Sequence, residues 1–404
     1  MRRVAVTGIG LLTSLGEGVE SSWSRLLDGA DGHRPVTLFD TAGQITDTAA
    51  EIPSIPEPRL DSTSARRLLR VDRIGLAAAE EAVDRSGLAD AGLDADRVSV
   101  CFGAGAAGLL EAWDFFRRRD EGGRPGLRHY FGEIQSGTSR WIAHRFGFEG
   151  PRTCPSTACS SSLTAIGIGA SWIAAGEVDA CVAGGAEGLG QLTFSGFDAV
   201  SALGPVPCSP FSAGRRGMSL GEGGAALVLE SMENARARGA TILAEVLSFG
   251  TSLDAHHMTA PHPEGAGVVP LIERCIEEAG LTAGDIGYVS AHGTGTIAND
   301  VAECTALSRV FGDHAARLAV ASQKSALGHC LGAAGAIESA VTVQALADGV
   351  VPPNLRLAEV DPDCGSFRFP TEATPMPDLR YALKQSFGFG GSNAALVLGT
   401  GEDA

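Results

Sequence analysis

Short apolar runs alternate along the chain with longer stretches in which apolar residues recur at helical spacing. The apolar runs predict buried strands at residues 4–7, 98–102, 180–184, 225–229, 288–291 and 394–398. The periodic stretches predict helices at residues 65–87, 160–175, 267–280, 299–311 and 332–348. Strands that alternate with helices are typical of an α/β protein whose sheets are buried on both faces.

Glycines divide these elements. Gly8 to Gly16 reads as a turn after the first strand, and Gly87 as the stop of the first helix. The 404 residues include 54 glycines, which fits close helix–strand packing but also a bias in codon usage. Both halves of the chain place a helix-rich segment between short strands, which predicts two similar halves divided near residues 235–250.

The net charge of −17 argues against nucleic acid or an anionic membrane as a partner of the whole surface. No apolar run approaches the ~20 residues that span a bilayer, and the opening VAVTGIGLL stretch is too short for a signal peptide. Two arginine runs stand out: Arg66, Arg67, Arg70 and Arg73, then Arg117, Arg118, Arg119, Arg124 and Arg128. Solvated helix faces usually explain such runs; a docking surface for an acidic carrier protein is the alternative.

Nine cysteines stand at scattered positions without a C-x-x-C pair. Their spacing indicates no zinc site and no thioredoxin-like motif, and we expect no metal. An odd number of cysteines without a secretory signal is typical of reduced thiols, so we expect a cytoplasmic protein.

Cys159 lies in the sequence TACSSS, where the helix over 160–175 is predicted to begin. Unpaired N–H groups and the positive end of the helix dipole favour a thiolate there, and a thiolate is the form of cysteine that attacks acyl groups. A lone cysteine is more often a buried structural residue, and Cys101, Cys181 and Cys304 fit that description.

Two histidine clusters combine polar residues with glycine. His292 opens the sequence HGTGT after a predicted strand, and Thr294 and Thr296 follow it. Lys324 and His329 begin and end the sequence KSALGH. Either histidine alone would more often be structural, but the combination with a cysteine indicates a reactive site.

Three further segments are rich in glycine. GAAGAIE ends at Glu338, and SFGFGGSN contains Phe387 and Phe389, which could line an apolar entrance. A plain glycine turn is the alternative for the latter. Gly103–Gly108 matches G-x-G-x-x-G, but it lies outside the first βα unit and lacks the acidic residue ~20 positions later, so a dinucleotide site is not expected.

The order TACSSS, HGTGT, KSALGH, GAAGAIE, SFGFGG resembles that of the elongating β-ketoacyl-acyl-carrier-protein synthases of the thiolase superfamily. The resemblance extends from residue 4 to residue 398. It implies a thiolase-like five-layer αβαβα fold of two similar halves, and usually a dimer. We expect one half at residues 1–240 with the nucleophilic cysteine, and another at residues 241–404 with the histidines, Lys, Glu and the glycine-rich gate.

The resemblance also implies roles for the residues. Cys159 would take an acyl group from the phosphopantetheine arm of an acyl carrier protein, and no other cofactor is implied. Malonyl-carrier would then lose CO₂, and the resulting enolate would attack the Cys159 thioester. His292 and His329 would donate hydrogen bonds to the enolate oxygen, with Lys324 and Glu338 as a supporting charged pair.

Other motif positions match binding features of the family. The N–H groups of Cys159 and Phe389 match its oxyanion hole, and Phe389 also matches a gate beside Phe387. Thr294 and Thr296 match residues that hold pantetheine. Initiating synthases use Cys-His-Asn and degradative thiolases use a second cysteine, so two histidines favour decarboxylative elongation.

Three departures from the family pattern narrow the pathway. Segment 203–221 is shorter than in housekeeping fatty-acid synthases, and Ser201 stands where many carry a basic contact to the carrier. Ala106 replaces a bulkier residue, which would deepen or reshape the acyl pocket. These features are similar to ketosynthase subunits of highly reducing type II polyketide systems, which make polyenes.

Such subunits often pair with a catalytically inactive homologue, the chain-length factor, so we expect either a homodimer or that heterodimer. Two alternatives stay open. One is housekeeping fatty-acid elongation. The other is that this chain is itself the chain-length factor, although those proteins lack the nucleophile.

Overall fold

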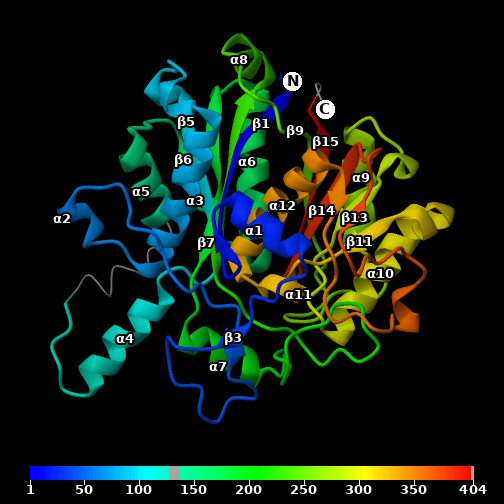
Figure 1. The fold of residues 1–404 in the computed structure, drawn as a ribbon, viewed down its shortest axis with the longest axis horizontal. Helices are drawn as coiled ribbons and strands as arrows, with labels where there is room; N and C mark the ends of the chain where they lie inside the picture. Colours follow the sequence, from blue (N-terminus) through cyan, green and yellow to red (C-terminus); the bar gives the residue numbers. More distant parts are fainter. Residues whose placement is uncertain (127–136, 402–404) are drawn as a thin grey trace.

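The computed structural model describes residues 1–126 and 137–401, and its strands form two half-sheets of the same design (Figure 1). The strand order is β1-β8-β7-β5-β6 in the first and β9-β15-β14-β10-β11 in the second. In each, the first three strands are antiparallel and the last three are parallel. The bounds are β1 Val4–Thr13, β5 Val98–Gly103, β6 Arg152–Thr153, β7 Ala180–Glu187 and β8 Gly223–Ser231, then β9 Ala244–Leu253, β10 Tyr288–Ser290, β11 Ala319–Ala321, β14 Tyr381–Gly388 and β15 Ser392–Thr400.

Helices separate and cover the half-sheets. α6 (Ser161–Ala175) and α12 (Ala334–Asp348) pack against each other between them (Figure 1). The outer face of the first half-sheet carries α3 (Arg70–Ser86) and α5 (Gly137–Phe146), and that of the second carries α9 (Val268–Glu278) and α10 (Ile297–Phe311). This stacking gives five layers, α-β-α-β-α, and confirms the predicted fold class.

Smaller elements connect the layers. The short helices and strands are α1 Val19–Leu27, α2 Ser62–Ala65, α4 Leu109–Asp120, α7 Gln191–Ala199, α8 Met232–Ala237 and α11 Lys324–Leu327, with β2 Gly16–Glu17, β3 Arg34–Pro35, β4 Thr48–Ala49, β12 Val350–Val351 and β13 Thr374–Pro375. β1 and β9 pair over three residues at one end of the strands, which joins the two half-sheets.

β1 continues through the glycines that predicted a turn. It pairs with β8 over most of its length, and only a register shift between Val6 and Gly8 marks the expected break. A Cβ atom at Gly8 would lie 2.4 Å from the Ala82 carbonyl oxygen, and one at Gly10 would lie 2.0 Å from that of Ala78. The prediction was wrong because these glycines allow α3 to approach the strand, rather than allowing the chain to turn.

The helix predicted over 65–87 begins later than expected, after the short helix α2 has ended at Ala65. Asp61 accepts hydrogen bonds from the N–H groups of Thr63 and Ser64 and thereby starts α2. The long helix α3 begins only at Arg70. Gly87 ends it in the left-handed region, at φ 66°, as predicted.

The core helix α6 is unusually apolar. The segment Ala158–Ala175 is the one helix within the described residues that could cross a membrane by length and composition, with a mean hydropathy of 1.3. With 18 residues, this segment comes closer to the length that spans a bilayer than the sequence analysis predicted for any apolar run. However, 61% of it is buried in the protein, between β5 and β7 on one side and α12 on the other. Its apolar character is therefore explained by its place in the central layer.

Candidate active site

Cys159 lies in a strained turn in front of α6. The turn Ala158–Ser160 forms one 3₁₀ turn, and Ala158 adopts φ 52° although it is not glycine. The second half repeats this arrangement, because Leu331 adopts φ 45° in front of α12. Strained backbone of this kind persists where the surrounding structure fixes it, and here it presents the cysteine to a cavity.

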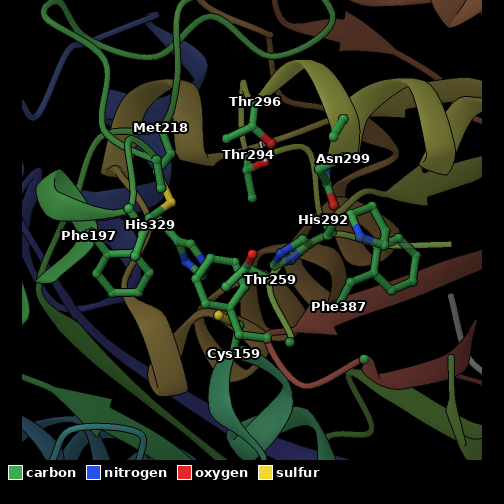
Figure 2. A pocket seen from close by; sticks show the side chains of 18 of the residues that line it. Cys159, Phe197, Met218, Thr259, His292, Thr294, Thr296, Asn299, His329 and Phe387 are labelled. Atoms are coloured by element: carbon green, nitrogen blue, oxygen red, sulfur yellow. Dashed lines mark hydrogen bonds between the residues drawn. The ribbon is translucent and has the colours of Figure 1, made fainter. Parts of the chain in front are cut away.

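The cavity beside Cys159 measures about 250 Å³. Figure 2 shows Cys159 on one side and the rings of His292 and His329 pointing into the same space. The two ring centroids are 5.3 Å apart, with the planes nearly perpendicular. The structure thus brings together three residues that are far apart in the sequence. The predicted residues in its wall are Cys159, His292, Thr294, Thr296, His329, Phe387 and Phe389.

Neighbouring groups fix the tautomer of both rings. The Nδ1 atom of His329 accepts a hydrogen bond from the N–H of Leu331, at 3.2 Å. The Nδ1 atom of His292 lies 3.4 Å from the ammonium of Lys324, which can only donate. Both rings therefore carry their proton on Nε2. The backbone of His292 is held as well, because its N–H and that of Gly293 donate to Glu303 at 2.7 Å.

The predicted charged pair is present and buried. Lys324 donates to Glu338 at 2.5 Å and to the His292 carbonyl oxygen at 2.6 Å. Both side chains are almost fully buried, at 0% and 4% exposure. Lys324 stands on α11 and Glu338 on α12, so the pair connects these helices to the loop that carries His292.

Burial keeps the three reactive groups neutral. It raises the pKa of the Cys159 thiol to about 11, and the charge of Lys324 and the Phe389 N–H oppose it only in part. The prediction of a resting thiolate was therefore wrong, because loss of solvation outweighs the helix start. Burial, with the charge of Lys324, also lowers the pKa of His292 and of His329 well below the ordinary value.

Phe389 stands between this cavity and a second, apolar one. It lines both, is 37% exposed, and its ring lies 5.6 Å from that of Phe197. A side chain at Gly388 would lie 2.8 Å from the Thr157 carbonyl oxygen, so only glycine lets this strand pass the nucleophile. The position agrees with the gate that the resemblance implied.

The second cavity measures about 460 Å³ and also reaches Cys159. Ala106 lines it, together with residues of α7. The carboxylate of Glu187 accepts the N–H groups of Gly105, Ala106 and Ala107 and so holds this wall in place. The same bonds occupy the N–H groups of the G-x-G-x-x-G segment, which is consistent with the expectation that it binds no dinucleotide phosphate.

The predicted docking arginines differ in whether they are available at the surface. Arg66 and Arg67 are exposed near the end of α2, and Arg124 is exposed beyond α4, while Arg128 lies outside the described residues. Arg70 is not available, because its guanidinium forms an ion pair with the fully buried Glu222 and also donates to the Ile52 carbonyl oxygen. Its assignment to docking is corrected: Arg70 neutralises a buried carboxylate.

Comparison with known proteins identifies the family. The description "Beta-ketoacyl synthase, N-terminal domain" matches residues 1–235, and "Beta-ketoacyl synthase, C-terminal domain" matches residues 243–358. The chain belongs to the β-ketoacyl synthase family. As a member, it is a condensing acyltransferase that acts on acyl groups carried by an acyl carrier protein.

Individual relatives cover the whole ketosynthase chain. A 3-oxoacyl-[acyl-carrier-protein] synthase 2 from Coxiella burnetii is 38% identical over 98% of both chains. Among solved structures, one described as the ishigamide ketosynthase/chain length factor is 35% identical with a TM-score of 0.92 over 99% of both chains. Another, a type II PKS acyl-carrier protein in complex with its ketosynthase (AntDE:AntF), is 28% identical with a TM-score of 0.91, over 99% of this chain and 100% of that one.

The structure adds residues that the motifs did not indicate. Lys384 forms a second ion pair with Glu338, and Glu187 and Glu303 hold the two loops already described. Phe197 and Thr259 line both cavities beside Cys159, and Figure 2 shows them in the first. The two glutamates stand next to or near glycine-rich motifs, which is a weak signal, and the others carry none.

Proposed function

We propose that this ketosynthase uses Cys159, His292 and His329 for decarboxylative condensation of malonyl-carrier with a cysteine-bound acyl chain. The observation that carries the proposal is the shared cavity, which places a thiol beside two imidazoles that both present an Nε2–H. Neutral imidazoles can donate to a developing enolate, and a neighbouring thiol can accept an acyl group.

In the first step, the sulfur of Cys159 forms a bond to the acyl carbonyl carbon, and the bond from that carbon to the pantetheine sulfur breaks. The proton that Cys159 loses passes to the departing pantetheine sulfur. Neither histidine is its acceptor, because Nε2 of each ring already carries a proton and Nδ1 of each ring faces a donor. The N–H groups of Cys159 and Phe389 stabilise the intermediate oxyanion.

In the second step, the bond between the malonyl methylene and its carboxylate breaks. CO₂ leaves, and the electron pair moves to the thioester oxygen, which His292 and His329 stabilise. The enolate carbon then forms a bond to the acyl carbonyl carbon, and the Cys159 thiolate is expelled. Thr294 and Thr296 line the same cavity and hold the pantetheine arm.

The acyl chain occupies the apolar cavity lined by Ala106, and the pathway is type II polyketide, with polyene chains as products. The small side chain of Ala106 supports this, as does the likeness to the ketosynthase structures named above. Leu192 and Val200 line the cavity yet are 43% and 54% exposed, which supports coverage by a partner subunit, namely a chain-length-factor homologue. The nine cysteines form no disulfide, which supports a cytoplasmic location.

Fatty-acid elongation is the second candidate, and the name of the Coxiella relative favours it. An assay with acyl-carrier and malonyl-carrier, with and without a co-expressed homologue, separates the two. We expect product only with the partner and a preference for unsaturated chains. Turnover of saturated chains by the protein alone would instead assign it to fatty-acid synthesis.

The same assay with Cys159→Ala tests the chemistry. Intact mass should show an acyl adduct on the natural protein and none on the variant, because none of the other eight cysteines lines either cavity beside Cys159. An adduct of equal size on Cys159→Ala would place the nucleophile elsewhere.

A further inference from the structure

Glu338 is paired with two lysines rather than one. Lys324 contacts one carboxylate oxygen of Glu338 at 2.5 Å. Lys384, on strand β14, contacts the other carboxylate oxygen at 2.6 Å. Lys384 is 0% exposed, and its ammonium also lies near the carbonyl oxygens of Ser290 and Gln385. One carboxylate between two ammonium groups leaves this cluster with one positive charge.

Burying a second cation beside Glu338 costs free energy that the ion pair with Lys324 does not require. Removing an ammonium from water costs free energy, and the first lysine already neutralises Glu338. The cost is reflected in the pKa of Lys384, which burial lowers to about 8 although the negative charge of Glu338 opposes this. An apolar residue on β14 would avoid this cost, so the charge needs an explanation.

The charge lies where both histidines feel it. Its positive field lowers the pKa of His292 and of His329, in addition to burial and Lys324. The charged groups that face Lys384 are Glu338 on α12, Lys324 on α11 and Glu303 on α10. Glu303 has the opposite sign, but it is engaged by two backbone N–H groups and by Gln385.

We propose that Lys384 is a positioning residue of the condensation site. It binds the carboxylate oxygen of Glu338 that Lys324 leaves open, and its charge holds both histidines as neutral Nε2–H donors. The inference rests on the proposed function of those histidines. A protonated ring would carry a second N–H on Nδ1, and this hydrogen would point at the ammonium of Lys324 or at the amide of Leu331. The positive cluster makes that state unfavourable.

The test compares Lys384→Met with Lys384→Arg, which keeps the charge. CO₂ release from malonyl-carrier is measured from pH 5 to pH 8. In Lys384→Met the acid limb of the pH–rate profile should move upward by about one pH unit, because both rings lose a neighbouring positive charge that disfavours their protonation. Lys384→Arg should restore the limb toward that of the natural protein. Lys384→Gln removes the charge but keeps a hydrogen-bond donor, and its acid limb should move upward as in Lys384→Met. If Lys384→Met does not fold, Lys384→Gln takes its place in the comparison.

A second measurement separates this role from a general structural one. Lys324 is the cation whose charge favours the Cys159 thiolate most. The pH profile of Cys159 alkylation by iodoacetamide should therefore be the same in Lys384→Met and in the natural protein. An unshifted acid limb in both uncharged variants would overturn the inference, as would an equal shift in the alkylation profile.

One control distinguishes failure of this inference from failure of the proposed function. His292→Ala should lose most CO₂ release at every pH. If His292→Ala released CO₂ at the natural rate, the proposed function itself would fail. If it were inactive while Lys384→Met kept the natural acid limb, only the role of Lys384 would be wrong.

Discussion

Two imidazoles, His292 and His329, share one cavity with a thiol, and the Nδ1 atom of each ring already faces a donor. Each ring is held by a group that can only donate to it. Burial keeps the thiol and both rings neutral at rest. The reactivity of these residues therefore arises when substrate enters, since the proton of the thiol can then pass to the departing pantetheine sulfur.

The depressed pKa values of both histidines make the folded state sensitive to acid. Below about pH 6.5 the unfolded chain binds protons on these residues that the folded protein does not bind. Their contribution to stability is complete above that pH and is lost as the pH falls. Each histidine should account for up to ~1.4 kcal/mol of unfolding free energy per pH unit.

Urea unfolding at pH 7 and pH 5.5 measures this effect, with the double variant His292→Asn, His329→Asn as the comparison. The variant should lose less stability between the two values. Glu187 acts in the opposite direction, because burial raises its pKa to about 7, but it is present in both proteins and cancels in the difference. Equal losses in both proteins would contradict the account of neutral buried rings.

Single residues were predictable from sequence where they stand in distinctive motifs. Cys159, His292 and His329 each lie among small residues, and the structure brings all three to one cavity. Lys384 was missed because it stands between Leu383 and Gln385 in an alternating strand, where a lysine normally faces solvent. Arg70 was misassigned for the converse reason: its buried partner Glu222 is 152 positions away in the sequence.

At the scale of elements, helical periodicity was the dependable signal. The helices predicted at 160–175, 267–280, 299–311 and 332–348 lie within two residues of α6, α9, α10 and α12 at each end. Two central strands, β9 and β14, were not predicted, because polar residues interrupt their apolar pattern. Glu245 and Ser248 of β9 and Lys384, Gln385 and Ser386 of β14 are buried, which only the assembled sheet explains.

Glycine was the misleading signal at the same scale. In β1 it serves a close contact with α3, whereas at Gly87 it ends a helix in the left-handed region. The sequence offers the same letter for both uses. What distinguishes them is the neighbouring backbone, and in β1 that neighbour lies some 70 positions later in the chain.

At the scale of the whole molecule, the repeated half explains why the site is assembled from distant segments. Each half-sheet leads into a strained turn and then a central helix, so the turns before α6 and α12 meet beside one cavity. The weak sequence similarity between the halves predicted a duplication, but it did not predict that the turns before α6 and α12 lie beside the same cavity. The distance between two turns is set by the packing of α6 on α12.

The net charge of −17 makes carrier docking depend on local positive charge. Arg66 and Arg67 are the exposed members of the first arginine run. Their double reversal, Arg66→Glu with Arg67→Glu, should raise the KM for carrier-bound substrates several-fold, and the difference should shrink at high salt. Turnover of a small thioester mimic should not change.

Arg70→Ala provides the contrast for that measurement. It leaves the buried Glu222 without its cation and should lower the unfolding free energy by about 3 kcal/mol. Equal effects of the Arg66 and Arg67 reversal on carrier-bound and small substrates would show that these residues do not dock the carrier.

The most direct test of the central claim follows the acyl group on Cys159 by intact mass. The protein is loaded from acyl-carrier, and malonyl-carrier is then added. The natural protein should lose the adduct as a chain extended by one malonyl-derived unit appears on the carrier. His329→Ala should gain the same adduct but discharge it about a hundredfold more slowly, because one enolate donor is missing. Discharge of the adduct by His329→Ala at the natural rate would contradict the account.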